Sequence, residues 1–241
     1  LLKIIEMAFK KGIKPTLYGV PQSPFVRKVR SFMHAKQLPF NIIPIMPGDS
    51  RKTFRRMSPF GKIPAYREGS LRLCDSSVIC AYLERCHPEN PLFPKDNRHY
   101  AHALWIEEYC DTVVSKIMTF RLMYQCFLKP AFRKIPPDKE LIEETLREDV
   151  PPILNHIENF IMNDEDFLAG PYLSIADISM TAHMLSYIYS GHEINGDKWP
   201  KTKKYIEKML ETGPFPKALR EENYPYYQVF LDKSWEVPDT V

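Results

Sequence analysis

The sequence predicts a small α/β domain followed by an all-helical domain. Segments typical of strands and helices alternate up to about residue 90. A proline-containing segment at residues 91–96 then interrupts the pattern, and beyond it apolar residues recur only at helical spacing. We therefore expect an α/β domain at residues 15–90, a linker at 91–96 and a helical domain at 97–241, which lie within the usual size range of domains.

The composition limits the classes of function. Of the 241 residues, 44% are hydrophobic and 26% charged, as in an ordinary globular protein, and the net charge of +3 is too small to indicate a nucleic-acid partner. The five cysteines include no Cys-x-x-Cys pair, so we expect reduced thiols in a cytoplasmic protein. We expect no membrane span and no metal site, because neither a long apolar run nor a ligand spacing for zinc is present. We interpret residues 1–14 as an N-terminal extension outside the fold.

The first elements should be a short strand, a loop and a helix. Residues 16–18 are strand formers followed by Gly19, and Ser23 with Pro24 is typical of a helix cap with proline at the first helical position. Apolar residues recur along the predicted helix at three- and four-residue spacing. They are Phe25, Val29, Phe32 and Met33.

Ser23 is the first candidate for chemistry. Its hydroxyl should lie at the positive end of a helix dipole, which favours an anion such as a thiolate. No His or Lys in the loop offers a general base, so we expect Ser23 to be a hydrogen-bond donor and not a nucleophile. Lowering a bound thiol's pKa by about 2 units takes roughly 2.7 kcal/mol. The alternative is that Ser23 only caps the helix.

A second strand and a hairpin should complete the sheet. The apolar run 40–45 should pair in parallel with the first strand, and the basic residues within 47–58 indicate a short exposed helix. A turn at residues 68–70 predicts two antiparallel strands, with Pro64 at the entrance of the first. If the Ile63-Pro64 bond is cis, the backbone of Ile63 faces outward and an extended peptide can pair with it.

Asp75 and Ser76 should cap the next helix. They end a strand and precede apolar residues at helical spacing. A second helix N-terminus would then lie beside the first, so that one binds a carboxylate and the other a thiolate.

The helical domain should begin with a long amphipathic helix that ends near Lys129-Pro130. Its predicted apolar positions are Ile106, Tyr109, Val113, Ile117, Phe120, Tyr124 and Phe127. A second helix should follow residues 136–138 with a break at Pro151-Pro152. Ser174 and Asp177 have the spacing of a capping box, and another helix should start at Trp199-Pro200.

Taken together, these motifs resemble those of the cytosolic glutathione S-transferases, from about Pro15 to about Tyr224. The order and spacing of the motifs carry the resemblance. They are Leu-Tyr-Gly followed by Ser-Pro-Phe at 23–25, Gly-Lys-Ile-Pro at 61–64, Asp-Ser at 75–76 and Ser-x-x-Asp at 174–177. The resemblance implies a thioredoxin-like N-terminal domain with βαβ-ββα order and a helical-bundle C-terminal domain.

The resemblance also implies roles for individual residues. Ser23 aligns with the serine that hydrogen-bonds the glutathione sulfur in the serine-type classes, and Asp177 would be a folding determinant. Ile63 would pair with the cysteinyl backbone of glutathione beside the cis-proline Pro64, and Asp75 with Ser76 would hold the γ-glutamyl end. The complete set of implied glutathione-binding residues is Phe25, Lys36, Lys62, Ile63, Pro64, Asp75 and Ser76.

The implied function is conjugation of the glutathione thiolate to small hydrophobic electrophiles, as in detoxification. Glutathione would be the co-substrate, with no further cofactor, and the protein would be a homodimer. Tyr109 and Val113 are candidates for the electrophile pocket, although their spacing equally predicts helix packing. The alternatives are a glutathione-dependent peroxidase, lyase or isomerase on the same fold, or a non-catalytic binding module.

Two residues depart from patterns within this family. Several classes have Glu where this chain has Asp75, and the cysteine-type classes have Cys where Ser23 stands. A serine cannot form a mixed disulfide, so we do not expect glutaredoxin-like reduction through residue 23.

Overall fold

The computed structural model describes residues 14–163 and 165–222. Most of the predicted extension, residues 1–13, and the end of the predicted helical domain, residues 223–241, lie outside the described residues. The chain divides into two compact units, Leu1–Leu92 and Phe93–Val241, and this boundary falls inside the expected linker.

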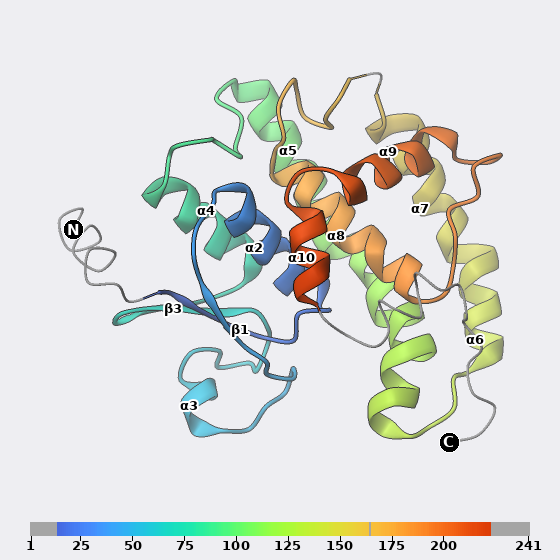
Figure 1. Cartoon of the computed structure of the whole chain (residues 1–241). Helices are drawn as coiled ribbons and strands as arrows, with labels where there is room; N and C mark the ends of the chain where they lie inside the picture. The colour runs from blue at the N-terminus through green and yellow to red at the C-terminus, as the bar shows by residue number, and fades with distance from the viewer. Residues whose placement is uncertain (1–13, 164, 223–241) are drawn as a thin grey trace. The chain divides into compact units, whose positions relative to one another are not determined.

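The first unit, coloured blue to cyan in Figure 1, contains a four-stranded sheet with the order β2-β1-β3-β4. β1 pairs in parallel with β2 and antiparallel with β3, which forms a hairpin with β4. This arrangement confirms the predicted βαβ-ββα order. The elements are β1 (Thr16–Tyr18), α2 (Pro24–Ala35), β2 (Asn41–Ile43), α3 (Lys52–Arg55), β3 (Ala65–Glu68), β4 (Leu71–Cys74) and α4 (Ser76–Cys86).

A small core lies against the sheet near α3. It consists of Ile45, Phe54, Met57 and Ala65, all buried, with Tyr18, Ile63 and Cys74 packed against it. The predicted basic helix therefore contributes a buried side chain to the core in addition to its exposed charged side chains. Phe54 fixes α3 to the sheet, while Lys52 is exposed.

The second unit is helical. Its only strand-like feature within the described residues is an isolated bridge between Phe167 and Gly170. The elements are α5 (Asn97–Tyr109), η1 (Cys110–Arg133), α6 (Lys139–Glu144), η2 (Thr145–Asp149), α7 (Val150–His156), η3 (Ile157–Ile161), α8 (Ile175–Tyr189), α9 (Pro200–Glu211) and α10 (Phe215–Glu221).

The long first helix of this unit differs from the prediction in its buried face. The segment η1 is a π-helix, in which hydrogen bonds join residues five apart, so each turn contains more residues than an α-helical turn. Its completely buried apolar residues recur every four positions, at Cys110, Val114, Met118 and Leu122. The prediction assumed the α-helical repeat, and for this reason it placed Val113 and Phe120 on the buried face, whereas both are exposed.

The predicted capping box is confirmed at the start of α8. Ser174 and Asp177 bond reciprocally, and Asp177 also accepts hydrogen bonds from the Leu168 amide and the Tyr205 hydroxyl. Asp177 is completely buried, and burial raises the pKa of its carboxyl. It therefore joins three segments of the helical unit, as expected of a folding determinant.

Candidate functional site

The predicted site segments of the first unit meet at one end of the sheet. Tyr18 of β1 pairs with Ala65 of β3, which in turn pairs with Cys74 of β4. At this end of the sheet, β1 leads into the Ser23 loop and β4 leads into Asp75. The Ile63-Pro64 bond comes directly before β3. The sheet register thus places the three predicted segments side by side.

Gly19 allows these segments to approach closely. It has a φ of +150°, and a Cβ there would lie 2.5 Å from the Val26 side chain and 3.1 Å from the Cβ of Ile63. Any side chain at position 19 would therefore push α2 and Ile63 apart. The loop before Ser23 can therefore pack against the segment that contains Ile63 only because residue 19 is a glycine.

Ser23 is the N-cap residue of α2, with Pro24 at the first helical position, as predicted. Its backbone is extended, with φ −64° and ψ 129°, and its side chain makes no capping hydrogen bond. The hydroxyl is partly exposed at the positive end of the helix dipole. Ser23 is thus positioned as a cap, while its hydroxyl remains available to donate to another group.

Two arginines of α2 fix the loop that carries Ser23. The Nη2 of Arg27 donates to the Gln22 carbonyl at 3.2 Å, and the Nη1 of Arg30 donates to the Pro21 carbonyl at 3.3 Å. The apolar spacing of the helix did not predict these contacts, because it identifies only the face that carries Phe25, Val29, Phe32 and Met33. The positions of the two arginines four and seven residues after Ser23, on the first two turns of the helix, are the only signal in the sequence.

The Ile63-Pro64 peptide bond is cis, as predicted. No backbone hydrogen bond engages the amide or the carbonyl of Ile63 within residues 14–163 and 165–222. Ile63 is half-buried, and its side chain packs on the core near α3. Its backbone groups are thus available to pair with an extended peptide.

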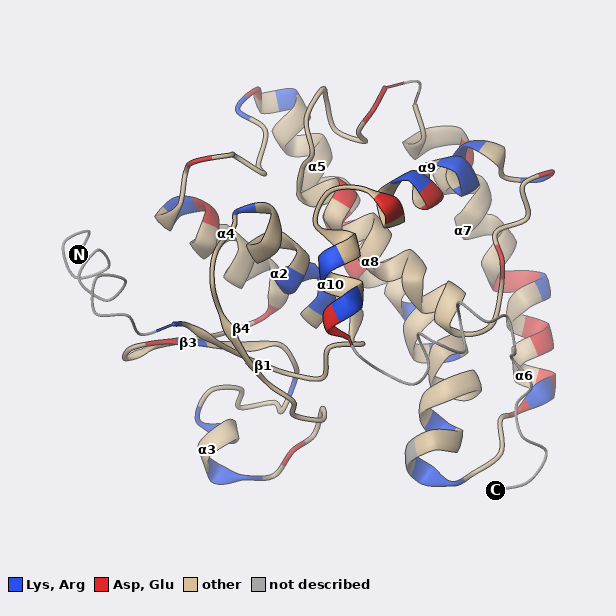
Figure 2. Cartoon of the chain, in the orientation of Figure 1, with Lys and Arg blue, Asp and Glu red and all other residues tan. Residues whose placement is uncertain are grey.

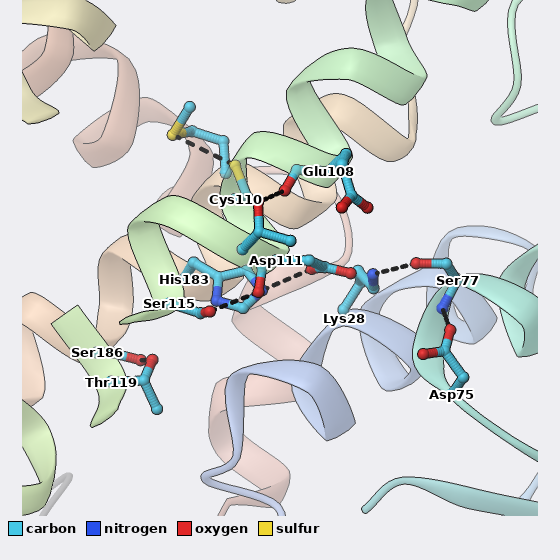
Figure 3. Close-up of polar contacts among 12 residues, drawn as sticks. Lys28, Asp75, Ser77, Glu108, Cys110, Asp111, Ser115, Thr119, His183 and Ser186 are labelled. Atoms are coloured by element: carbon cyan, nitrogen blue, oxygen red, sulfur yellow. Dashed lines mark hydrogen bonds and ion pairs between the residues drawn. The ribbon is translucent and has the colours of Figure 1, made fainter. Parts of the chain in front are cut away.

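Asp75 is the N-cap residue of α4, and its carboxylate accepts a hydrogen bond from the Ser77 amide at 3.0 Å (Figure 3). It also accepts one from the Val78 amide at 3.2 Å. Asp75 has a φ of +86°, which is uncommon for any residue except glycine. Ser76 is buried as the first residue of the helix. The Lys28 amine donates to the Ser77 hydroxyl at 3.1 Å, which joins α2 to α4 beside this cap.

The structure does not support Lys36 as a glutathione ligand. Its amine is completely buried and forms an ion pair with Glu84 at 2.8 Å. It also donates to three carbonyls of the segment after α4, those of His87, Glu89 and Asn90. Lys36 lies at the C-terminal end of α2, whereas Ser23 lies at its N-terminal end. The prediction considered its charge but not these internal acceptors.

The other predicted residues of this unit lie along the site segments. Phe25 is partly buried one residue after Pro24, and Lys62 is exposed just before Ile63. The Lys62 carbonyl accepts a hydrogen bond from the Ser58 hydroxyl at 2.7 Å. The structure therefore places Ser23, Phe25, Lys62, Ile63, Pro64, Asp75 and Ser76 on the three neighbouring segments.

The two candidates for the electrophile pocket lie in the second unit. Tyr109 ends α5 and contacts Trp105 and His156, with ring centroids 5.8 and 5.0 Å away. Burial raises the pKa of Tyr109 to about 12, so it stays protonated near neutral pH. Val113 is 41% exposed and therefore does not belong to the buried face of η1.

Within residues 14–163 and 165–222 the structure contains neither a membrane-spanning helix nor a cluster of metal ligands. No helix there is both long and apolar enough to cross a bilayer. No group of three or more His, Cys, Asp or Glu side chains there could hold a metal ion.

Comparison with known families matches both units. The model of the "Glutathione S-transferase, N-terminal domain" matches residues 17–91. The model of the "Glutathione S-transferase, C-terminal domain" matches residues 123–214.

Relatives and solved structures agree with these matches. A glutathione S-transferase of Hyoscyamus muticus is 28% identical over 214 residues, covering 84% of this chain and 96% of the relative. FtsZ-localized protein A of Caulobacter vibrioides is 26% identical over 184 residues, covering 75% and 80%. The crystal structure of a glutathione S-transferase from Rhodospirillum rubrum F11 superposes with a TM-score of 0.80 at 25% identity, covering 92% and 100%.

Proposed function

The chain belongs to the cytosolic glutathione S-transferase family, and on this premise we propose that it is a serine-type glutathione transferase that conjugates glutathione to small electrophiles. The observation that carries the proposal is the position of Ser23. Its hydroxyl lies at the N-terminus of α2 and makes no capping bond, and the loop before it approaches Ile63, whose backbone forms no backbone hydrogen bond among the described residues.

We propose that glutathione binds along the three segments. The backbone of Ile63 would pair with the cysteinyl unit, and the N-terminus of α4 with Asp75 and Ser76 would hold the γ-glutamyl end. The glutathione sulfur would then lie by Ser23. The Asp75 carboxylate carries a negative charge, and a charge of this sign suits the γ-glutamyl amine.

In the proposed mechanism the Ser23 hydroxyl donates a hydrogen bond to the glutathione sulfur. The helix dipole and this bond favour the thiolate over the thiol, and the proton leaves to solvent. The thiolate then attacks an electrophilic carbon, and the leaving group departs with its electron pair. Binding also holds the two reactants together, which lowers the entropic part of the barrier.

The electrophile would contact the helical unit. Val113 supports this part of the proposal because its apolar side chain is exposed and has no role in the buried face of η1. Tyr109 offers a protonated phenol and an aromatic surface.

We also propose a cytoplasmic homodimer that uses glutathione as co-substrate and no other cofactor. All five cysteines lie within the described residues, and none forms a disulfide, which agrees with a reducing compartment.

Substitution of Ser23 tests the proposal. Ser23→Ala removes the donor, and because one oxyanion-type donor contributes about 10²–10³ in rate, we expect turnover of a chlorinated aromatic electrophile to fall by that order. Glutathione binding, measured by calorimetry, should persist, while the ultraviolet absorbance of the bound thiolate at neutral pH should disappear. Ser23→Thr, which retains a hydroxyl, is the matched control. Equal turnover of Ser23→Ala and wild type would contradict the proposal.

A binding module without catalysis is the second candidate. It is favoured by the relative named FtsZ-localized protein A, because this name describes where that protein is found and does not describe an enzyme. In that case the wild-type protein would show no thiolate absorbance and no conjugation, and Ser23→Ala would behave as the wild type does.

A further inference from the structure

The loop between β2 and β3 contains a polar network around Arg55 that the proposed mechanism does not use. The loop includes α3, and its cations are visible in blue in Figure 2. It leads directly into Ile63 and Pro64. Its conformation therefore determines where the peptide-pairing backbone lies.

Arg55 binds both sides of this loop. Its Nε donates to the Asp49 carbonyl at 2.9 Å and its Nη2 to the Gly48 carbonyl at 3.3 Å, both before α3. Its Nη1 donates to the Pro59 carbonyl at 3.0 Å, after α3. One guanidinium thus holds three carbonyls, for which its planar, rigid set of donors is well suited.

Gly61 packs directly on this guanidinium. A Cβ at Gly61 would lie 2.8 Å from the Cζ of Arg55, and the φ of Gly61 is +67°. The Gly61 carbonyl also accepts a hydrogen bond from the Gly48 amide at 2.8 Å. The backbone of Gly61 therefore packs against the side chain of Arg55 on one side and bonds to the backbone of Gly48 on the other.

Ser58 continues the network to the residue before Ile63. Its buried hydroxyl donates to the Lys62 carbonyl, and its own carbonyl accepts from the Gly61 amide at 2.9 Å. Arg55, Gly61 and Ser58 together restrain the backbone from residue 58 to residue 62. The amide and the carbonyl of Ile63, the next residue, form no backbone hydrogen bond within residues 14–163 and 165–222.

We propose that Arg55 is a positioning residue for glutathione binding. It does not touch the tripeptide; it holds the 58–62 backbone so that Ile63 presents its amide and carbonyl in one fixed geometry. Such preorganisation lowers the entropic cost of binding. This inference rests on the proposed function and assigns a purpose to a cation that the sequence places on a solvated face.

Arg55→Met tests the proposal because methionine retains the aliphatic length and removes all donors. We expect the KM for glutathione to rise about ten-fold, which corresponds to about 1.4 kcal/mol. The kcat at saturating glutathione and the KM for the electrophile should change by less than about two-fold, since the lost binding energy is the same in the ground state and in the transition state. Arg55→Lys should lie between, because an ammonium cannot reach all three carbonyls in the same way.

Arg56→Met is the matched control. Arg56 is the exposed neighbour of Arg55, and the structure gives its side chain no hydrogen bond to any described residue. We expect its kinetics to equal those of the wild type. Equal KM values for glutathione in the two methionine variants would overturn the proposal. The proposal would also be overturned if Arg55→Met lowered kcat, raised the KM values for both substrates and reduced thermal stability. That result would show a merely structural role for Arg55.

Amide hydrogen exchange separates this inference from the proposed function. In Arg55→Met the amides of Gly48 and Gly61 should exchange about ten-fold faster than in Arg56→Met, because the loop that protects them opens more often. This comparison needs no glutathione. If the wild type fails to bind glutathione, the proposed function is wrong. If the amides of Gly48 and Gly61 exchange at the same rate in Arg55→Met and Arg56→Met, the role of Arg55 is wrong.

Discussion

At the scale of single residues, Asp75 combines two properties that different substitutions can separate. Its carboxylate caps α4, and its backbone has a φ of +86°. A residue in this conformation is strained by about 1–3 kcal/mol and persists only where its surroundings fix it, which is common at binding sites. Asn, like Asp, is found at positive φ more often than most residues, and it also caps helices.

We therefore expect Asp75→Asn and Asp75→Ala to differ. The Asn variant should retain the stability of the wild type within about 0.5 kcal/mol because it keeps the cap. It should nevertheless bind glutathione more weakly, since it lacks the charge proposed to hold the γ-glutamyl amine. The Ala variant should lose about 1–2 kcal/mol of stability in addition, from the missing cap.

Urea unfolding and calorimetric titration of glutathione measure the two effects. Arg85→Ala is a control for a substitution in α4 away from its N-terminus, because Arg85 lies in the last turn of the helix and is exposed. If Asp75→Asn binds glutathione as tightly as the wild type, the carboxylate acts only as a cap.

The same scale shows where prediction from the sequence stops. Ser23 and Asp75 could be predicted as caps because helix caps depend on neighbouring residues in the chain. The cis form of Pro64 was expected from the family resemblance, since an X–Pro bond can adopt either isomer. The contacts of Lys36 and Arg55 could not be predicted, because their acceptors come from other segments. Lys36 binds carbonyls 51 to 54 residues away, and the Arg55 acceptors depend on how its loop turns back on itself. From the sequence alone, a charged residue that binds distant carbonyls cannot be distinguished from one that faces solvent.

At the scale of elements, the start of α9 is stabilised by a distant carboxylate. Trp199 occupies the N-cap position and gives no capping hydrogen bond from its side chain. Instead Glu158 of η3 accepts from the Lys201 amide at 3.0 Å, and from the amide and hydroxyl of Thr202 at 2.8 and 2.7 Å. The sequence predicts a helix at Pro200 but not this cap.

These contacts predict a pH-dependent contribution to stability. Burial alone would raise the pKa of Glu158, but the hydrogen bonds from Thr202 and Lys201 outweigh it and the pKa is lowered. A carboxyl whose pKa is lower in the folded state stabilises the fold above its unfolded pKa of about 4.3, and the stabilisation is lost as the pH falls through the folded value. We expect Glu158→Gln to be about 1–2 kcal/mol less stable than wild type at pH 7.

Unfolding by urea at pH 7, 5, 4 and 3 tests this expectation. The difference between wild type and Glu158→Gln should be constant between pH 7 and 5 and shrink at lower pH. Glu207→Gln is the control, because Glu207 is exposed and lies 3.9 Å from Lys203 on the same helix. A difference that does not change with pH would show that Glu158 acts through packing and not through its charge.

The element scale also explains the misplaced face of the long helix. Tyr109 and Val113 were predicted from an α-helical repeat, and the π-helical turns of η1 shift each following side chain around the axis. Hydrophobic spacing detects that a helix is amphipathic, but Val113 and Val114 are both apolar, so the sequence does not choose between them. The strands were predictable because the hairpin turn at residues 69–70 fixes their register.

At the scale of the whole molecule, membership of the family settles the fold and leaves the activity to be measured. A single fold supports many functions, and one relative of this chain bears the name of a localised protein instead of an enzyme. The experiments on Ser23 and Arg55 examine chemistry and binding separately. The state of association is a third, independent property.

Phe60 connects the proposed homodimer to a specific surface. Its side chain is 84% exposed, although it lies between Pro59 and Gly61 in the loop that Arg55 restrains. Val78 on α4 of the same unit is 49% exposed. A rigid, exposed aromatic ring is an expected feature of a surface that a partner covers, because burying it gains about 1.5–3 kcal/mol.

If a second copy covers Phe60, Phe60→Ser should raise the dimer dissociation constant by about 10- to 150-fold, which corresponds to that burial energy. Light scattering coupled to size exclusion, over a dilution series, measures the change. Tyr172→Ser is the control, since Tyr172 is 78% exposed but belongs to the other unit. Because the Phe60 ring adds little to its own unit's core, the variant should unfold at the same urea concentration as the wild type under dissociating conditions. A wild type that remains monomeric throughout, or equal dissociation of the two variants, would refute the assignment of this surface to a homodimer.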